Sequence, residues 1–303
     1  MNSDKPILVL MDEFLANQDI RENSRKKYRD NLHVYINWLT RNVDNVSSPS
    51  KADIIKYKEY LINSGRTPST VDNYLAPVRQ MYKYFADSEI YKNITIGVKS
   101  PKKDGGYSKD YLKPELVSRL LASINKTTDK GLRDYAIINL MVRTGMRCIE
   151  VARADVKDLN LEEGRWLLQI QGKGRWAKDR ALGVTDKIVN PIAVYIEAHQ
   201  LQNGSPLFLN HARVSNNTRI TTITISKIVK KYLRAIGIDT VKLSAHSLRH
   251  TAAIIALKSG ADILAVQSML GHRKVETTMI YQRAIEEERG RDGTAIRLMD
   301  DAY

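Results

Sequence analysis

The sequence has almost no cysteine and no long apolar run. Its 303 residues include one cysteine, Cys148, which excludes an internal disulfide and any metal site built from several cysteines. Cys148 stands in an apolar segment, so we expect a small packed side chain. No hydrophobic run approaches the length of about 20 residues that a membrane-spanning helix requires. Residues 1–18 have no small-residue cleavage pattern, which favours a first helix over a signal peptide and predicts a cytoplasmic protein.

Motifs for bound metal ions and nucleotides are missing too. The sequence has no His-Glu-x-x-His, and the acidic run at residues 286–288 is expected to be exposed, so we expect no metal site. The Gly-Lys-Gly at residues 172–174 is not a Walker loop, because no Ser or Thr follows its lysine. No other segment has a nucleotide-binding pattern, and we therefore expect no ATP and no other cofactor.

Positive charge, by contrast, is abundant. The chain has 48 Lys and Arg against 34 Asp and Glu, which gives a net charge of +14 and a pI near 9.6. Such a balance indicates a polyanionic partner, although charge alone does not separate nucleic acid from a membrane surface. A hydrophobic fraction of 43% is typical of a globular protein, and a length of 303 residues favours two domains over one.

Residues 1–87 predict a helical domain of four amphipathic helices. Ser24 and Ser50 are the expected N-caps of the second and third helices, and Pro68 suits the first turn of the fourth. Pro77 lies inside the fourth helix and should bend it. Polar and basic residues of these helices have the chemistry to bind phosphates and base edges, with a simple solvated face as the alternative. The candidates for DNA contact are Lys26, Lys27, Thr70, Asn73, Arg79 and Lys83.

Three further segments follow. Residues 88–113 are rich in Lys, Gly, Ser and Pro without a sustained period, which predicts a basic interdomain linker. Residues 114–283 mix helical and strand patterns and form the expected second domain. Residues 284–303 form a tail with apolar residues after a glycine, and a frayed terminus is its simplest interpretation. The fold class expected is mainly α with a small β-sheet.

The second domain has a predicted β-hairpin and a basic helix. Alternating apolar residues at 166–170 and a returning segment at 181–184 enclose the glycine turn that contains Lys173. Trp176 and several basic residues crowd the same turn, which could equally be a solvated loop. Residues 223–236 predict a helix whose basic residues alternate with an apolar stripe. This hairpin and helix add two candidates for DNA contact, Arg175 and Lys230.

The most informative stretch is residues 246–281. His246 and Arg249 lie three apart at the start of an amphipathic helix, so both side chains point to one side of its first turn. His272 follows the glycine that ends a second, short helix, and Tyr281 comes nine residues later. These residue types at this spacing suit phosphodiester chemistry.

Each element of this stretch also has a simpler interpretation. A single histidine on a helix is more often structural than catalytic, and one tyrosine among fifteen has no meaning alone. Ser259-Gly260 is expected to end the first helix and Asp262 to begin the second, so the pair could form a helix-turn-helix that inserts into DNA.

The chain nevertheless resembles the tyrosine recombinases of the phage integrase type. In that family a His-x-x-Arg pair, a Leu-Gly-His and a tyrosine nine residues beyond its histidine recur together. Residues 246–249, residues 270–272 and Tyr281 match these three motifs.

Two upstream motifs strengthen the resemblance. The family has an arginine after a Thr-Gly, matched here by Arg147 with Glu150 three residues on, and a lysine in a tight hairpin, matched by Lys173. The five motifs occur in the family's order between residues 132 and 283. One motif alone is weak, whereas five in order are specific.

The resemblance implies a role for each matched residue. Tyr281 attacks the scissile phosphate and forms a 3′-phosphotyrosine, while Arg147 and Arg249 bind the non-bridging oxygens. Lys173 protonates the departing 5′ oxygen. The remaining roles are proton removal from the tyrosine by His246, a hydrogen bond to the phosphate from His272, and orientation of the set by Glu150. A guanidinium stays protonated and binds phosphate oxygens through two donors, so this chemistry requires neither a metal ion nor ATP.

The resemblance also implies an architecture and partners. A SAM-like core-binding domain would precede a mixed α/β catalytic domain, in the simple two-domain layout of integrases and chromosome-dimer resolvases. The expected partners are double-stranded DNA with inverted-repeat core sites, a homotetramer on two such sites, and accessory DNA-bending proteins, with the tail docking on a neighbouring protomer. This predicts a nucleoid-associated site-specific recombinase. A type IB topoisomerase and a helix-turn-helix regulator are the alternatives.

Overall fold

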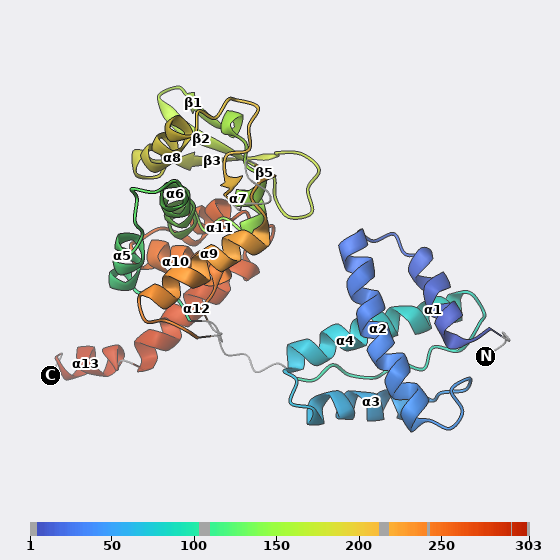
Figure 1. Ribbon diagram of the computed structural model, residues 1–303. Helices are drawn as coiled ribbons and strands as arrows, with labels where there is room; N and C mark the ends of the chain where they lie inside the picture. The colour runs from blue at the N-terminus through green and yellow to red at the C-terminus, as the bar shows by residue number, and fades with distance from the viewer. Residues whose placement is uncertain (1–4, 103–109, 212–217, 241–242, 292, 302–303) are drawn as a thin grey trace. The chain divides into compact units, whose positions relative to one another are not determined.

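The computed structural model describes most of the chain as two compact units, residues 1–106 and residues 107–303. The described residues are 5–102, 110–211, 218–240, 243–291 and 293–301. Both units are mostly helical and one small sheet of three strands lies in the second, so the predicted fold class is confirmed (Figure 1).

The first unit is a bundle of four helices around an aromatic core. Tyr35, Tyr57 and Tyr82 are fully buried. The hydroxyls of Tyr35 and Tyr82 lie 2.8 Å apart, so these two hydroxyls are partners inside the core. The four helices that the apolar spacing predicts are α1 (Ile7–Ala16), α2 (Glu22–Asn42), α3 (Lys51–Asn63) and α4 (Pro68–Asp87).

Two of the three predicted helix starts are confirmed. Ser50 caps α3 in a capping box with Asp53, and Pro68 begins α4 behind the cap Thr67. The start predicted at Ser24 is wrong. Helix α2 begins two residues earlier, at Glu22, because the Ser24 amide already donates to the carbonyl of Arg21.

The first unit extends beyond the predicted boundary at residue 87. Ile94 and Val98 are buried in its core, although the polar composition around them predicts a linker. Arg79 of α4 donates to the carbonyl of Val98 and to the Ser100 hydroxyl, both at 3.2 Å. These contacts fasten the segment up to residue 102 to the bundle. The rest of the expected linker includes residues 103–109, which lie outside the described residues.

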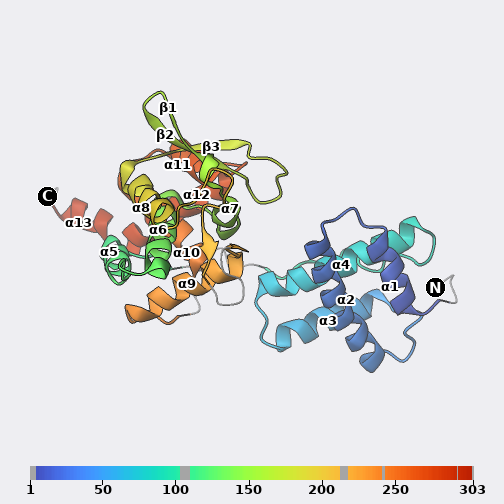
Figure 2. The same ribbon diagram turned by 45° about the horizontal axis from the view of Figure 1, so that its top comes forward.

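The second unit has a three-stranded antiparallel sheet at one end, in both views of the molecule (Figures 1 and 2). The predicted hairpin is confirmed, with Leu168 opposite Leu182 and Ile170 opposite Arg180. The first strand was not predicted, although its four residues alternate between leucine and a polar residue, and three of the four are exposed. The strands are β1 (Leu159–Glu162), β2 (Arg165–Ile170) and β3 (Arg180–Val184), with a separate pair β4 (Leu209–Asn210) and β5 (Thr218–Arg219).

Helices make up the rest of the unit, and α10 lies at its centre. Helix α10 contacts α6, α9, α11 and α12, and its first ten residues are mostly buried. The helices are α5 (Pro114–Ala122), α6 (Asp129–Thr144), α7 (Cys148–Arg153), the 3-10 turn η1 (Val156–Asp158), α8 (Asp186–Ala198), α9 (Thr222–Ala235), α10 (Ala245–Lys258), α11 (Ile263–Leu270), α12 (Glu276–Arg291) and α13 (Thr294–Asp300).

The predicted tail, residues 284–303, does not start at a break in the structure. Helix α12 continues through residue 284, and Ile285 is buried against α10. Gly293, with φ of 65°, separates α12 from α13. Helix α13 extends from the end of α12 (Figure 1). Its apolar side chains Ile296, Leu298 and Met299 are exposed.

Candidate active site

Arg147 is held in place by Glu150 through two hydrogen bonds. Arg147 is the N-cap residue of α7, and its backbone amide donates to Glu150 Oε2 at 2.8 Å. The Arg147 guanidinium donates to Glu150 Oε1, also at 2.8 Å. Glu150 is only 2% exposed, so its carboxylate is a buried acceptor that fixes the arginine from two sides. The other guanidinium donors of Arg147 stay available to an anion.

Arg249 hydrogen-bonds to two segments that are distant in the sequence, the one before Arg147 and the one before His272. Its guanidinium donates to the carbonyl of Gly145 at 2.7 Å and to the carbonyl of Leu270 at 2.8 Å. Gly145 has φ of 66°, and a Cβ at this position would lie 2.5 Å from Leu270 Cδ2, so only glycine fits. Arg249 is 1% exposed, and burial lowers its pKa to about 10. It is still protonated at neutral pH.

His272 follows the left-handed Gly271 that ends α11, as predicted. Its Nδ1 lies 2.9 Å from the hydroxyl of Thr278, and its ring stacks on Tyr281 with centroids 6.3 Å apart. Burial, followed by the positive charges of Arg249 and Arg147, lowers the pKa of His272 to about 4. His272 is therefore neutral at physiological pH.

Tyr281 lies on α12 and is buried, at 2% exposure. The ring of His250 meets it edge-on at 5.3 Å, and Arg249 hydrogen-bonds its side chain. Burial raises the pKa of Tyr281, and the charges of Arg249 and Arg147 oppose that rise. The hydroxyl is thus held beside the positive charge that would stabilise a phenolate.

His246 lies at the first turn of α10 and is exposed. Its ring meets that of His250 at 4.7 Å, and His250 in turn contacts Tyr281. His246 and Arg249 thus belong to one helical turn, as the spacing predicts, but their burial differs completely.

Lys173 is exposed at the tip of the hairpin between β2 and β3. The side chain of Gln171 closes the loop by donating to the carbonyls of Arg175 and Trp176, at 3.1 and 3.0 Å. Arg153 of α7 donates to the carbonyl of Gly172 at 3.2 Å. The loop that contains Lys173 is therefore tethered to the helix that Arg147 begins.

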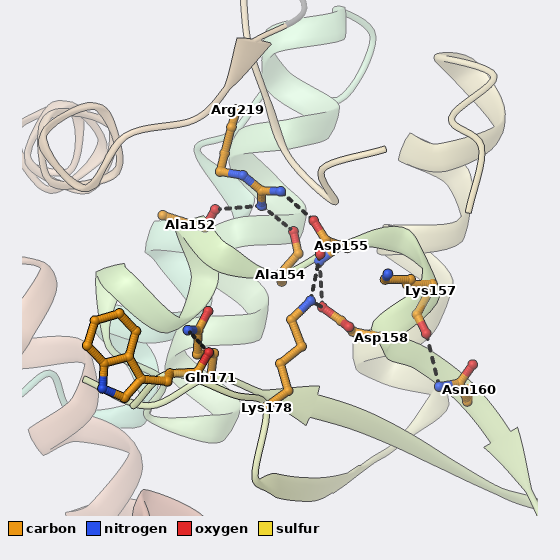
Figure 3. A network of polar contacts seen from close by, with 10 residues as sticks. Ala152, Ala154, Asp155, Lys157, Asp158, Asn160, Gln171, Lys178 and Arg219 are labelled. Carbon is orange, nitrogen blue, oxygen red and sulfur yellow. Dashed lines mark hydrogen bonds and ion pairs between the residues drawn. The ribbon is translucent and has the colours of Figure 1, made fainter. Parts of the chain in front are cut away.

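The far side of the same hairpin is fixed by an ionic network. Lys178 binds Asp155 and Asp158, and Arg219 binds Asp155 from the opposite side (Figure 3). Arg219 also donates to the carbonyls of Ala152 and Ala154, both at 3.1 Å. These partners raise the pKa of Lys178 against the effect of its burial, so it stays charged. The network leaves Lys173 as the exposed lysine of the hairpin.

The start of α7, the β2–β3 hairpin and the segment that contains His272 line a pocket of about 650 Å³. Four motif residues line it, namely Arg147, Glu150, Lys173 and His272, and the exposed basic residues Arg273 and Lys274 lie on its rim. The pocket has the size and charge to take a phosphate and its flanking sugars. Arg249 and Tyr281 are buried rather than lining it.

Sequence reasoning missed three residues of this site. Arg180 lines the pocket, Thr278 bonds His272, and His250 contacts Tyr281. A basic residue close to Lys173 in the sequence was the signal for Arg180. His250 is next to Arg249 in the sequence, and Thr278 lies one helical turn before Tyr281. Nothing in their residue types distinguishes them from residues that only pack.

The predicted DNA-contact residues are in varied surroundings. Lys26, Lys27, Asn73 and Lys83 are exposed on α2 and α4, while Thr70 is half-buried behind the cap of α4. The other three make contacts that the sequence did not predict. Arg79 binds Asp72 and the segment after α4, Arg175 pairs with Asp179 at 2.9 Å, and Lys230 binds Asp239 and the carbonyl of Thr240.

Within the described residues, no group of three or more His, Cys, Asp or Glu side chains is arranged to hold a metal ion. No helix in the same part of the chain is long and apolar enough to cross a membrane.

Two family profiles match the chain. That of the phage integrase family matches residues 110–288, and that of the phage integrase N-terminal SAM-like domain matches residues 7–92. The first match covers more than half of the chain and includes every motif residue from Arg147 to Tyr281. The two matches correspond to the two units of the structure.

Similar proteins bear the name tyrosine recombinase XerD. That of Staphylococcus epidermidis is 30% identical over 288 residues, which cover 90% of this chain and 93% of the relative. That of Listeria monocytogenes is 28% identical over 285 residues, with the same coverage of 90% and 93%. Among solved structures, the XerH site-specific recombinase bound to a palindromic difH substrate matches with a TM-score of 0.74 and 21% identity, over 91% of this chain and 80% of that chain.

Proposed function

The chain belongs to the phage integrase family, and from that premise we propose that it is a site-specific tyrosine recombinase that cleaves and rejoins double-stranded DNA. The observation that carries the proposal is the basic pocket in which Arg147, Lys173 and His272 meet beside Tyr281. These four residues are spread over positions 147 to 281 of the sequence, and the fold of the second unit brings them close to one another.

The reaction requires stabilisation of charge on the non-bridging phosphate oxygens. Arg147, fixed by Glu150, points free guanidinium donors to the pocket. Arg249 uses two of its five donors on backbone carbonyls and retains others for the second oxygen. His272 is neutral, and its Nδ1 lies 2.9 Å from the Thr278 hydroxyl. We propose that this hydroxyl donates to Nδ1, so that the imidazole proton lies on Nε2 and donates to the phosphate.

Bond making and breaking then follow in one displacement. Tyr281 Oη attacks phosphorus, its proton leaves towards His246, and the bond from phosphorus to the 5′ oxygen breaks. Lys173 gives a proton to that oxygen. The resulting 3′-phosphotyrosine keeps the phosphoester bond energy, so a 5′ hydroxyl from a second duplex reverses the step without ATP. The positive charge in the pocket supplies what a metal ion supplies in other nucleases.

The two alternatives have less support. The named relatives are recombinases, and the family profiles include an N-terminal SAM-like domain, which favours strand exchange between sites over relaxation of supercoils by a topoisomerase. A helix-turn-helix regulator gives no reason for Arg147, Lys173 and His272 to line one pocket beside Tyr281.

We extend the proposal to the assembly on DNA. A tetramer on two inverted-repeat core sites, aided by accessory DNA-bending proteins, would place the protein on the nucleoid. The exposed apolar side chains of α13, Ile296, Leu298 and Met299, are the surface that we propose docks on a neighbouring protomer. Deletion of residues 292–303 should abolish tetramers on paired sites while single-site binding persists.

Covalent trapping tests the central proposal. The protein is mixed with fragmented, nicked DNA from its own host and denatured, and the attached DNA is sequenced. Wild-type protein should retain fragments that share one recombination site, and Tyr281→Phe should retain none while it still binds DNA. Tyr135→Phe, which removes a hydroxyl from α6 outside the pocket, is the matched control and should trap as the wild type does. Equal trapping by Tyr281→Phe would contradict the assignment of the nucleophile.

A further inference from the structure

Arg180 is a pocket residue that no motif includes. It is the first residue of β3 and lies opposite Ile170 of β2. Ile170 comes three residues before Lys173 in the sequence. Its guanidinium donates to the carbonyl of Met269 at 2.8 Å and to that of Ser268 at 3.3 Å. These carbonyls belong to the last turn of α11, where the helix leaves acceptors without a partner of its own. One arginine thus joins the hairpin to the end of the helix before His272.

Arg180 also explains the glycine before His272. A Cβ on Gly271 would lie 2.9 Å from both Cζ and Nε of Arg180 and 3.1 Å from its Nη1. The guanidinium therefore occupies the space that any other residue at position 271 would need. Gly271 has φ of 66° as well, so two independent constraints require glycine here.

A second nitrogen of the Arg180 guanidinium, Nη2, faces Glu150. Nη2 lies 3.7 Å from Glu150 Oε2, is itself buried, and has no hydrogen-bond partner among the described residues. The Arg180 side chain is 21% exposed and that of Glu150 is 1% exposed, so little water screens the attraction. Glu150 Oε2 is the oxygen that accepts the backbone amide of Arg147. Arg180 thus contacts the group that orients Arg147 as well as the loop that orients His272.

We propose that Arg180 is a positioning residue for strand cleavage, which holds the Lys173 hairpin, the His272 loop and the Arg147–Glu150 pair in one fixed arrangement. The inference rests on the proposed function of these residues. A lysine does not replace Arg180, because a single ammonium lacks the planar fork that reaches two carbonyls on one side and a carboxylate on the other.

Arg180→Lys tests this role, because it keeps the charge and removes the fork. Arg165→Lys is the matched control, since Arg165 is exposed on the neighbouring strand and does not line the pocket. With a nicked duplex recovered by covalent trapping, Arg180→Lys should lower the single-turnover cleavage rate by about 10- to 100-fold, as expected when catalytic groups are misplaced. Affinity for that duplex should stay within about twofold of the wild type. Arg165→Lys should match the wild type in both.

A measurement without DNA separates this inference from the proposed function. In NMR spectra of the full chain, the His272 imidazole signals should move in Arg180→Lys and stay in place in Arg165→Lys. Arg180→Gln serves as a second variant if the lysine variant does not fold, and it should also raise the pKa of His272 above about 4, because one nearby positive charge is gone.

Two outcomes would overturn the inference. The first is wild-type cleavage by Arg180→Lys, and the second is an unchanged His272 signal in both Arg180 variants. A wild-type protein that traps no DNA counts against the proposed function alone, and shifted His272 signals would still support the positioning role of Arg180.

Discussion

The active site has an open half and a buried half, and the two differ in what they contribute. The open half, Arg147, Lys173 and His272, lines the pocket, and the Arg147 side chain is 28% exposed. The buried half, Arg249 and Tyr281, is 1% and 2% exposed. The open half has charge available to a phosphate. In the buried half, Arg249 donates to two backbone carbonyls and Tyr281 packs against two histidine rings. We propose that phosphate binding and exposure of the nucleophile are separate events.

This division separates binding from reaction. A phosphate can enter the open half and find donors there, while Tyr281 stays packed between His250 and His272. Cleavage then needs a local movement that brings the Tyr281 hydroxyl to the phosphorus. A recombinase that must not cut DNA before its partner site arrives benefits from such a separation. Variants that affect one half and spare the other test the comparison.

The largest expected difference is between Arg249→Met and Lys173→Met. Both should lower the yield of covalent adduct by about 10²- to 10³-fold, the usual result of removing one donor at a developing charge. Only Arg249→Met should also destabilise the fold, because it leaves the buried carbonyls of Gly145 and Leu270 unsatisfied at about 1–3 kcal/mol each. Lys173 is exposed, so its removal should leave the free energy of unfolding unchanged.

Urea unfolding with parallel trapping assays measures this difference. A Lys173→Met protein as unstable as Arg249→Met would show that the hairpin tip is part of the structural core. An Arg249→Met protein of wild-type stability would show that the buried half has no structural role, and the comparison between the halves would fail.

A smaller effect is expected from Thr278, which links the two halves. It is fully buried on α12, one turn before Tyr281, and its hydroxyl lies 2.9 Å from His272 Nδ1. Thr278→Val keeps the shape and removes the hydroxyl, so the imidazole tautomer is no longer fixed. The cleavage rate should fall about tenfold, at the lower end of the effects seen when a supporting hydrogen bond is removed. Thr278→Ser keeps the hydroxyl and should restore the rate.

The ¹⁵N chemical shifts of the His272 ring report its tautomer directly. They should show the proton on Nε2 in the wild type and in Thr278→Ser, and a mixture of tautomers in Thr278→Val. Equal cleavage rates in the valine and serine variants would mean that the bond to Thr278 has no part in the reaction.

The sequence predicted those features that are determined by residues close to one another in the chain. Gly271 ends a helix and Asp262 begins one through their own local preferences, and both predictions are confirmed. The motif residues were recognised through a family resemblance that fixes order and spacing. Each of these signals is contained within a few consecutive residues.

The missed features depend on distant contacts. Arg180 meets Met269 across 89 positions, and nothing near residue 180 indicates that partner. Ile94 and Val98 are isolated apolar residues in a polar segment, so their burial against the first bundle was not predicted. The burial of Arg249 was also missed, because a charged residue is rarely buried unless the fold supplies carbonyls for it.

The last expected effect is on stability at acid pH, and it depends on His272 at the boundary between the halves. The pKa of His272 in the folded chain is about 4, below the 6.5 of an unperturbed histidine. Between these values the unfolded chain binds more protons than the folded one, so stability should fall as pH drops from about 6.5 to about 4. In His272→Gln this part of the pH dependence should disappear. Urea midpoints at pH 7 and pH 4.5 for both proteins measure it, and Glu and Asp residues contribute equally to both. Parallel pH curves for the two proteins would mean that His272 titrates normally and that the positive charge of the pocket does not reach it.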